Sequence, residues 1–288
     1  MQAFIYVLII VSTATQSVLG RLFSKKSSQS TAFNALKSCS ALVLFSFVAV
    51  FNFTFHIPTI IFGALYGVSL CVSMYAGYQA ICRGPMALSS MLVSFSVIIP
   101  LVWGVTVGNE TLKIIQYFAI AFLFCAFIIT NLDKIVAKKQ TKKDGTNYGV
   151  WLLFVAITFI SNGVCSILQK QHQTFYPGMY SKEFMVFAML FCLVVFSIFA
   201  FVKIPYKKFR SIKGKWLGLF AGVANSVANF LTLWLAGQEN ASVLFPMISA
   251  GTILASLLCG RLIFKEKLKI NHYFALVFGI SAVVLLKL

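Results

Sequence analysis

The sequence predicts an all-α integral membrane protein with ten transmembrane helices arranged as two inverted five-helix repeats. Three observations lead to this fold class. Of the 288 residues, 60% are hydrophobic and 10% are charged, and the mean hydropathy is +0.91. The apolar residues form runs that can cross a bilayer, which takes about 20 residues per helix. The second half of the chain also repeats short patterns of the first.

The apolar runs predict ten membrane spans joined by polar connections. The first run has no basic segment before it and is about 20 residues long, so we expect a span and not a cleaved signal peptide. The longest polar gap, residues 134–147, is rich in lysine and separates a first repeat at 1–133 from a second at 148–288. The predicted spans cover residues 3–22, 32–51, 58–80, 86–106, 112–131, 148–169, 181–203, 215–236, 241–263 and 269–287.

The two halves share patterns in the same order, which indicates an internal duplication. Residues 104–113 match residues 260–269 in a glycine, the glutamate, a leucine and the final lysine. Upstream, the Gly-x-x-x-Gly pattern of residues 63–67 matches that of residues 218–222, and we expect both to be helix-packing seams. Because each repeat has five helices, the second enters the membrane in the opposite direction. In secondary transporters of this kind, the substrate site lies between the repeats.

The net charge of +18 lies mainly in the connections on one side of the predicted bundle. Connections that follow odd-numbered spans hold 19 basic residues, and those that follow even-numbered spans hold three. Basic residues favour the cytoplasmic side, so this asymmetry predicts that both termini lie outside. The sequence has no basic face with interleaved aromatic residues outside the spans, so we expect no nucleic-acid partner.

The loops at residues 108–112 and 264–268, each with a glutamate before the last helix of its repeat, resemble those of the drug/metabolite transporter superfamily, in its ten-span EamA-like branch. Lys37 stands where that family often has a basic residue, early in the second span. Residues 79–87 resemble the family's corner between the third and fourth spans. The resemblance implies a transporter with cytoplasmic termini, whose fourth and ninth spans line the substrate cavity.

Polar side chains inside the predicted spans are the candidates for substrate binding, because such groups are costly in hydrocarbon. Lys37 could contact a carboxylate or a phosphate, or could extend to the interface on its long stem. Asn225 and Asn229 are four residues apart and share one helix face. Hydrogen bonding between helices and close packing are the alternative roles for these residues. The predicted cavity lining is Gln16, Lys37, Tyr75, Gln79, Ser94, Asn162, Asn225, Asn229 and Ser249.

The acidic residues and histidines fall at span ends or in connections, which argues against proton coupling through a central carboxylate. We expect Glu110 and Glu266 to be structural and to tie a loop by a charge-assisted hydrogen bond. The seven cysteines include no Cys-x-x-Cys pair, so we expect no metal site and no cofactor. The sequence has neither an H-E-x-x-H nor a G-x-S-x-G motif, so we do not expect an enzyme.

These features predict a secondary transporter that moves a small polar metabolite, such as an amino acid or an organic anion, by alternating access. The alternative is a multidrug exporter or a lipid-carrier flippase of the same superfamily. We expect a multi-pass protein of the bacterial cytoplasmic membrane, with lipid and a small-molecule substrate as its partners. The sequence leaves open the substrate, the coupling ion, the direction of transport and whether the chain forms a homodimer.

Overall fold

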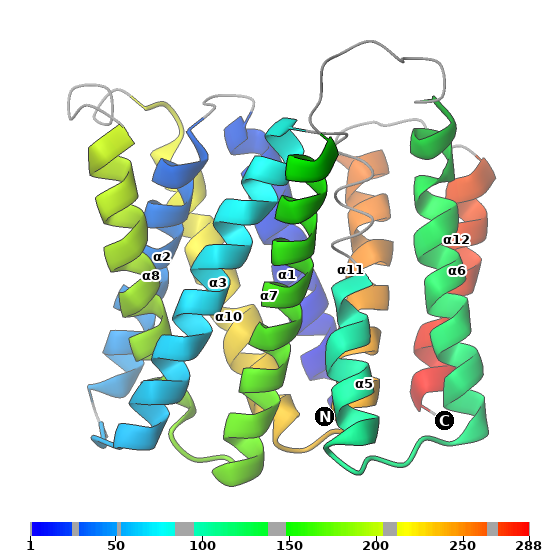
Figure 1. Ribbon diagram of the computed structural model, residues 1–288, viewed down its shortest axis with the longest axis horizontal. Helices are drawn as coiled ribbons and strands as arrows, with labels where there is room; N and C mark the ends of the chain where they lie inside the picture. The colour runs from blue at the N-terminus through cyan, green and yellow to red at the C-terminus, as the bar shows by residue number, and fades with distance from the viewer. Residues whose placement is uncertain are drawn as a thin grey trace. The chain divides into compact units, whose positions relative to one another are not determined.

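The computed structural model describes residues 2–24, 29–50, 53–83, 95–137, 148–203, 212–263 and 270–287. Within these ranges the chain forms ten α-helices and one short 3-10 helix, and no strand (Figure 1). The helices are α1 (Gln2–Ser24), α2 (Ser30–Ala49), α3 (Ile57–Arg83), η1 (Phe95–Val97), α5 (Ile98–Thr106), α6 (Ile114–Ala137), α7 (Tyr148–Phe175), α8 (Ser181–Lys203), α10 (Lys215–Ala236), α11 (Ala241–Leu262) and α12 (Ile270–Lys287).

Six of the described helices are long and apolar enough to cross a membrane, namely α1, α2, α3, α7, α8 and α10. Shorter apolar helical stretches occur at Phe95–Thr106, Ile114–Ala126, Ala241–Ala255 and Val277–Leu286. A helix satisfies its backbone hydrogen bonds within one segment, and this is why apolar runs of such length become helices in hydrocarbon. The all-α prediction is confirmed for the described residues.

Two helices end six residues beyond their predicted spans, α6 at 137 against 131 and α7 at 175 against 169. The sixth span is predicted to end at residue 169, but α7 continues to Phe175. His172 and Gln173 in this extension are buried, so their polar side chains are covered by protein and do not face lipid. Helix α6 continues to Ala137, into the predicted linker, whose remaining residues lie outside the described ranges.

The chain divides into two compact units. Unit 1 comprises residues 1–71 and 168–238, and unit 2 comprises residues 72–167 and 239–288. Two of the boundaries between the units fall within helices. Residue 71 lies in α3, and residue 168 lies in α7. Each unit therefore contains segments from both halves of the sequence.

In unit 1, α2 packs against α8 and α10, and α1 packs against α10. Helices α2 and α8 run antiparallel (Figure 1). Ala32 near the start of α2 lies against Ala200 near the end of α8. At the opposite end, the backbone N–H and the hydroxyl of Thr54, which follows α2, donate to Glu183 at the start of α8, both at 3.2 Å.

The first glycine pair brings α3 close to α8 in unit 1. A Cβ added at Gly63 would lie 2.8 Å from the carbonyl oxygen of Phe184, and one added at Gly67 would lie 2.9 Å from that of Ala188. Both obstacles are backbone atoms, which cannot move aside as a side chain can. The predicted packing role of this pair is confirmed.

The second glycine pair brings α10 close to α2. A Cβ added at Gly218 would lie 3.0 Å from Leu36 Cβ. One added at Gly222 would collide with the carbonyl oxygen of Lys37 and the hydroxyl of Ser40. This pair is also a packing seam, as predicted.

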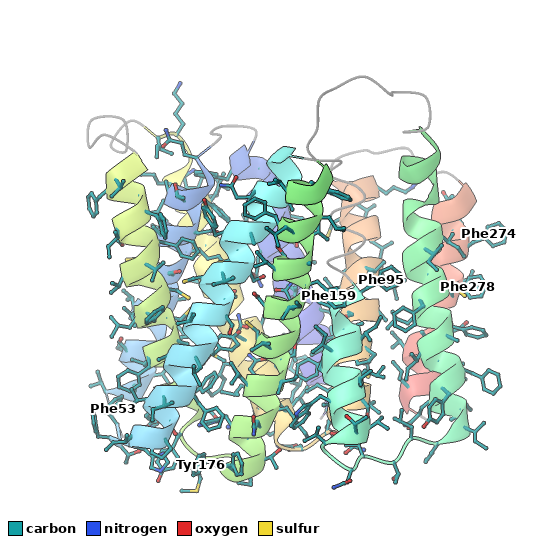
Figure 2. The ribbon with its side chains drawn as sticks, viewed as in Figure 1. Phe53, Phe95, Phe159, Tyr176, Phe274 and Phe278 are labelled. Carbon is teal, nitrogen blue, oxygen red and sulfur yellow. The ribbon has the colours of Figure 1, made fainter. Side chains whose placement is uncertain are left out.

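In unit 2, α6 packs against α12, and α11 packs against α5 and α12. Helices α6 and α12 run antiparallel, because Gln116 near the start of α6 donates to the carbonyl of Leu286 near the end of α12 (3.4 Å). Between these points, the rings of Phe122 and Phe278 meet edge to face at 5.4 Å. Phe278 and its neighbour Phe274 project from α12 in Figure 2.

The Glu110 carboxylate caps the start of α11 in unit 2. Its Oε1 accepts from the backbone N–H of Ala241 (2.7 Å), and its Oε2 accepts from the backbone N–H and the hydroxyl of Ser242 (2.9 and 2.6 Å). Asn240 at the N-cap position makes no side-chain capping bond, so Glu110 performs that function from another segment. The structural role predicted for Glu110 is confirmed, while Glu266 lies outside the described residues.

Candidate functional site

A chain of buried side-chain hydrogen bonds joins α7, α3 and α10 in unit 1. Gln169 Nε2 donates to the Tyr66 hydroxyl (3.3 Å), which donates to Asn229 Oδ1 (2.8 Å). Asn229 Nδ2 in turn donates to the side-chain oxygen and the backbone carbonyl of Asn225 (3.0 and 2.9 Å). The predicted pair Asn225 and Asn229 therefore forms the centre of a polar network in the middle of α10.

The donor and the acceptor of each hydrogen bond around Asn229 can be assigned, because a backbone carbonyl can only accept. The Asn225 carbonyl identifies the Asn229 nitrogen as the donor, so the Asn229 oxygen faces Tyr66. The side-chain oxygen of Asn225 is occupied by Asn229, and its nitrogen meets the Met189 sulfur at 4.0 Å. A thioether is a weak acceptor. The amide N–H of Asn225 is thus a hydrogen-bond donor that has only a weak acceptor in this network.

Lys37 contributes a positive charge to the interior of unit 1. Its side chain is 9% exposed. Among the described residues its ammonium has neither an ion pair nor a hydrogen bond, and the group that acts on its charge is the Cys192 thiol of α8. A lysine that extended to the membrane interface would expose its ammonium there. The low exposure of Lys37 instead favours an ammonium that is directed inward.

The Lys37 ammonium and the Asn225 amide lie against the same face of α8. The Cys192 thiol lies within electrostatic range of the Lys37 ammonium, and Asn225 meets Met189. Cys192 and Met189 are three residues apart, so they are neighbours on one helix face. The backbone of Lys37 also touches Gly222, which precedes Asn225 by about one helical turn. The arrangement combines a cation with an amide donor, which suits an acceptor-rich solute such as a carboxylate or a phosphate.

The remaining predicted residues do not join this network. Asn162 accepts a hydrogen bond from the Ser73 hydroxyl (2.5 Å), so its oxygen is occupied within unit 2. Gln16 is half-buried in α1, and Tyr75 is exposed on α3. Tyr75, Gln79, Asn162 and Ser249 belong to unit 2, and Ser94 lies outside the described residues.

A second polar network, which was not predicted from the sequence, lies at the end of α7. His172 Nε2 lies 3.1 Å from Thr59 Oγ1, which lies 2.9 Å from His56 Nδ1. On the other side of the imidazole, Gln173 Nε2 lies 3.1 Å from His172 Nδ1 and donates to Ser181 Oγ (3.0 Å). The helical spacing of Gln169, His172 and Gln173 is the signal that could have revealed this face.

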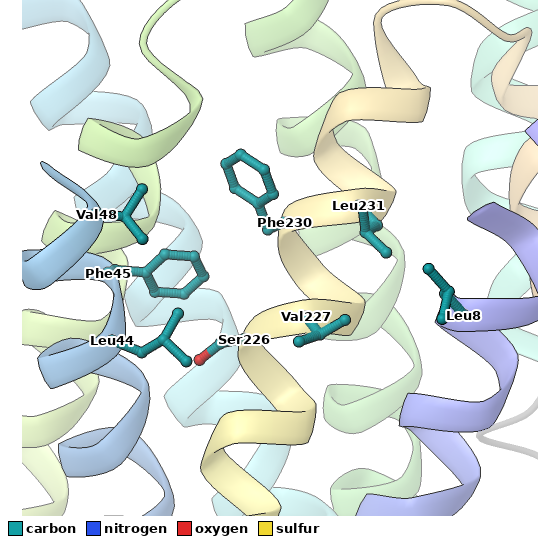
Figure 3. A pocket seen from close by; sticks show the side chains of 8 residues that line it. All are labelled: Leu8, Leu44, Phe45, Val48, Ser226, Val227, Phe230 and Leu231. Atoms are coloured by element: carbon teal, nitrogen blue, oxygen red, sulfur yellow. The ribbon is translucent and has the colours of Figure 1, made fainter. Parts of the chain in front are cut away.

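An apolar cavity of about 310 Å³ lies between α1, α2 and α10 in unit 1 (Figure 3). The polar atom in its wall, Ser226 Oγ, donates to the Gly222 carbonyl (2.9 Å) and is therefore satisfied. Such a cavity suits hydrocarbon better than a polar solute. Its lining residues are Leu8, Leu44, Phe45, Val48, Ser226, Val227, Phe230 and Leu231.

The described residues contain no group of three or more His, Cys, Asp or Glu side chains that could hold a metal ion. Six cysteines are free thiols, namely Cys39, Cys71, Cys125, Cys165, Cys192 and Cys259. The two polar networks of unit 1, together with Lys37, contain amides, hydroxyls, imidazoles and one ammonium.

Six described helices that are long and apolar enough to cross a membrane define the class of multi-pass membrane proteins. Residues 149–288 match the model of the EamA-like transporter family. The second half of the chain is therefore similar to this family, and the resemblance predicted from the sequence is confirmed. This match over the second half indicates a membrane transporter of the drug/metabolite type.

The fold itself recurs in a solved structure. A crystal structure of a protein superposes with a TM-score of 0.78, covering 98% of this chain and 94% of the other, at 11% sequence identity. At this identity the likeness shows the fold alone. A search of curated proteins finds no match to the chain.

Proposed function

We propose that the protein is a secondary carrier that moves a small polar metabolite, such as an amino acid or an organic anion, across the bacterial cytoplasmic membrane. The observation that carries this proposal is the buried ammonium of Lys37, which has no counter-ion among the described residues. A buried charge without a partner raises the free energy of the empty protein. An anionic group on the solute supplies the missing charge.

The hydrogen-bond inventory supports an acceptor-rich solute. The chain of donation runs from Gln169 through Tyr66 and Asn229 to Asn225, and it ends at an amide N–H that faces only a thioether among the described residues. N–H groups of Asn225 and Lys37 are therefore available to a solute. A carboxylate can accept from both, since each of its oxygens has two lone pairs.

Equivalent contacts support two inverted repeats. In one seam, Gly63 and Gly67 of α3 meet Phe184 and Ala188 of α8. In the other seam, Gly218 and Gly222 of α10 meet α2. The partners on α2 are Phe33, whose carbonyl lies 3.4 Å from a Cβ added at Gly218, and Lys37. The spacing from Phe33 to Lys37 equals that from Phe184 to Ala188, so the two seams correspond contact by contact.

The helix directions also support the inverted arrangement. The corresponding helices α2 and α8 run antiparallel in unit 1, and α6 and α12 do so in unit 2. Phe122 and Phe278, which match at the same offset as Glu110 and Glu266, touch each other. The family match to residues 149–288 covers the proposed second repeat. Rocking of such repeats would expose the site to each side in turn, which is alternating access.

The apolar cavity favours one alternative function. A space of about 310 Å³ between α1, α2 and α10 could hold part of a lipophilic molecule. A multidrug exporter or a lipid-carrier flippase would use such a surface in place of the polar network. The cavity has no spare polar group to orient a small metabolite, so we assign the metabolite to Lys37 and Asn225.

A thermal-shift screen of the purified protein against amino acids, organic acids, nucleotides and lipophilic cations separates these functions. Stabilisation by a zwitterion or an anion, followed by counterflow of that solute in proteoliposomes, is the expected result. Stabilisation by lipophilic cations or lipids alone would contradict the metabolite carrier and support the apolar cavity as the site.

A further inference from the structure

The apolar cavity of unit 1 is a candidate binding site that is separate from the polar networks (Figure 3). It measures about 310 Å³, and its lining includes Leu8 on α1, Leu44 on α2 and Phe230 on α10. The rings of Phe45 and Phe230, with centroids 6.2 Å apart, join α2 to α10 in its wall. This volume is at the lower end of the range for small-molecule pockets, about 300–1,000 Å³. None of the eight lining residues is charged, so the cavity suits an apolar group.

Hydrocarbon fits this cavity better than water or empty space does. A buried water needs two to four polar partners. Ser226 Oγ, the polar side-chain atom of the lining, already donates to the Gly222 carbonyl at 2.9 Å. If the cavity stayed empty, its lining atoms would lose dispersion contacts that closely packed protein interiors make. An apolar occupant supplies those contacts and leaves the hydroxyl bond of Ser226 intact.

The cavity continues the lipid-facing face of α10. Trp216, Phe220 and Val223 are exposed by 52%, 61% and 42%, and their spacing places them on one face of the helix. The next positions in that spacing are Val227 and Phe230, which are half-buried and line the cavity. The same face of α10 thus meets lipid along its first turns and lies between α1 and α2 further on. The cavity is therefore in contact with the lipid that surrounds the helices.

The cavity lies at the depth of one membrane leaflet. Leu8 near the start of α1, Val48 near the end of α2 and Leu231 near the end of α10 all line it. At 1.5 Å per residue, each of them lies within about 9 Å of that helix end along the axis. Half of the hydrocarbon core is about 15 Å thick. Val48 is 45% exposed, so a hydrocarbon chain of this leaflet can enter beside it without leaving the apolar layer.

We propose that the cavity binds one acyl chain of a membrane phospholipid, which stays with the protein and is not transported. A lipid chain is apolar along its length, and it is abundant wherever the cavity meets the bilayer. Because the lining has no charged residue, the headgroup stays outside the cavity, at the interface beside the end of α2. The chain fills the space between α1, α2 and α10, and burial of its methylene groups provides the affinity.

The bound chain and the solute network lie on opposite sides of α10. Successive residues of an α-helix are about 100° apart, so Val227 lies about 200° around the helix from Asn225. Asn225 faces Met189 of α8, and its neighbour Asn229 accepts from Tyr66 of α3. A transported solute passes between the repeats of a carrier, whereas the chain enters from the lipid-facing side. The lipid site is therefore independent of the solute and goes beyond the proposed function.

Photo-crosslinking of the full chain in detergent micelles tests the site. The probe is a phospholipid that carries a diazirine in one acyl chain, and it is titrated into the purified protein. Labelled peptides from α2 and α10 report the cavity, while peptides with the exposed Val277 and Val284 of α12 report ordinary lipid contact. Labelling of the cavity peptides should saturate, and an excess of the unlabelled phospholipid should displace it. Labelling of α12 should rise in proportion to the probe.

Two valine-to-phenylalanine changes on the same face of α10 give a matched comparison. Val227→Phe places a ring in the cavity, while Val223→Phe places one on the exposed part of this face, one turn earlier. Each buried methylene group corresponds to about fourfold in affinity, so displacement of two by Val227→Phe should weaken probe binding at the cavity about fifteenfold. Val223→Phe should bind the probe as the wild type does, and both variants should keep the labelling of α12.

A second filling variant, Leu8→Phe, reaches the cavity from α1 and serves if Val227→Phe fails to fold. Equal labelling of the cavity peptides in the wild type and the filling variant would overturn the proposal, as would labelling that never saturates. Displacement of the probe by tetraphenylphosphonium but not by unlabelled phospholipid would overturn the lipid assignment in favour of a lipophilic cation. Solute counterflow is measured separately, so its failure would count against the carrier and not against the lipid site.

Discussion

The buried charge of Lys37 should lower stability and promote binding. Lys37→Met keeps an unbranched stem and removes a charge that has no partner among the described residues, so the Tm of the ligand-free protein should rise. The same change should weaken binding of an anionic solute by about 2 kcal/mol, or roughly thirtyfold in Kd. Lys37→Arg retains the charge and should keep most of the affinity. Thermal shift with and without the solute measures both effects.

The opposite pattern would identify an interfacial lysine. If the ammonium reached the aqueous boundary, Lys37→Met would leave the Tm of the empty protein unchanged or lower it, because an exposed charge carries little burial penalty. Anion binding would then be equal in the wild type and both variants. That result would remove Lys37 from the site and leave Asn225 as the free donor.

Glu110 stabilises α11 from a segment that is distant in the sequence. We expect the negative charge of its carboxylate to contribute to this stabilisation more than the shape of the side chain does. Glu110→Gln should lower the free energy of unfolding by about 1 kcal/mol or more, since it loses two charge-assisted bonds to backbone N–H groups at a helix start. Ser242→Ala removes the hydroxyl bond alone and should cost less. Denaturant unfolding in mixed micelles measures the loss of unfolding free energy in each variant. A larger loss for Ser242→Ala than for Glu110→Gln would contradict the capping role.

At the scale of the helix, the seam between α10 and α2 should tolerate no side chain at Gly222. Gly222→Ala places a methyl group against the Lys37 carbonyl and the Ser40 hydroxyl, so it should cost about 1–3 kcal/mol as the helices separate. Gly20→Ala in α1 is the matched control. There the nearest atom is a Phe33 ring carbon at 3.8 Å, an ordinary contact.

The control, Gly20→Ala, should not lower the free energy of unfolding as Gly222→Ala does. Alanine exceeds glycine in helix propensity by about 1 kcal/mol, so Gly20→Ala should be neutral or stabilising. Comparison of the two variants by denaturant unfolding separates close packing from propensity. Equal effects of Gly222→Ala and Gly20→Ala would show that α2 and α10 do not approach as closely as the seam requires.

The helices could be predicted from the sequence because lipid imposes a length and a composition on each of them. The end of α7 was predicted too early for the same reason. Hydropathy treats His172 and Gln173 as aqueous residues, but protein surrounds them and supplies their hydrogen bonds. A rule based on the lipid environment cannot recognise a polar segment that is covered by neighbouring helices.

The candidate site could be predicted only in part. The four-residue spacing placed Asn225 and Asn229 on one face, and the isolated charge drew attention to Lys37. Tyr66 and Gln169 were missed because their role depends on contacts between α3, α7 and α10, which are far apart in the sequence. The sequence contains no local signal for such a contact.

For the whole molecule, the boundaries between the two sequence repeats differ from the boundaries between the two compact units. Helix α3 of the first half packs on α8 of the second, and α10 of the second packs on α2 of the first. Neither half can complete its seam alone. Residues 1–140 and 141–288 expressed separately should therefore be unstable, while coexpression should give a complex that copurifies. A half that is monodisperse and helical by itself would contradict this dependence.

The two ends of unit 1 should lie on opposite sides of the membrane, with the basic end in the cytoplasm. Thr54 bonds to Glu183 at one end, near the exposed Met179 of the α7–α8 turn, and Ile212 packs with Ala32 and Ala200 at the other. The exposed Lys213 follows Ile212 in a connection rich in basic residues.

Because basic residues favour the cytoplasmic side, a single cysteine at Met179 should react with an impermeant maleimide in intact cells, and one at Lys213 only after permeabilisation. The reverse pattern would favour the cytoplasmic termini that the family resemblance implies. Labelling of both positions from one side would contradict helices that cross the membrane between them, and with it the inverted repeats.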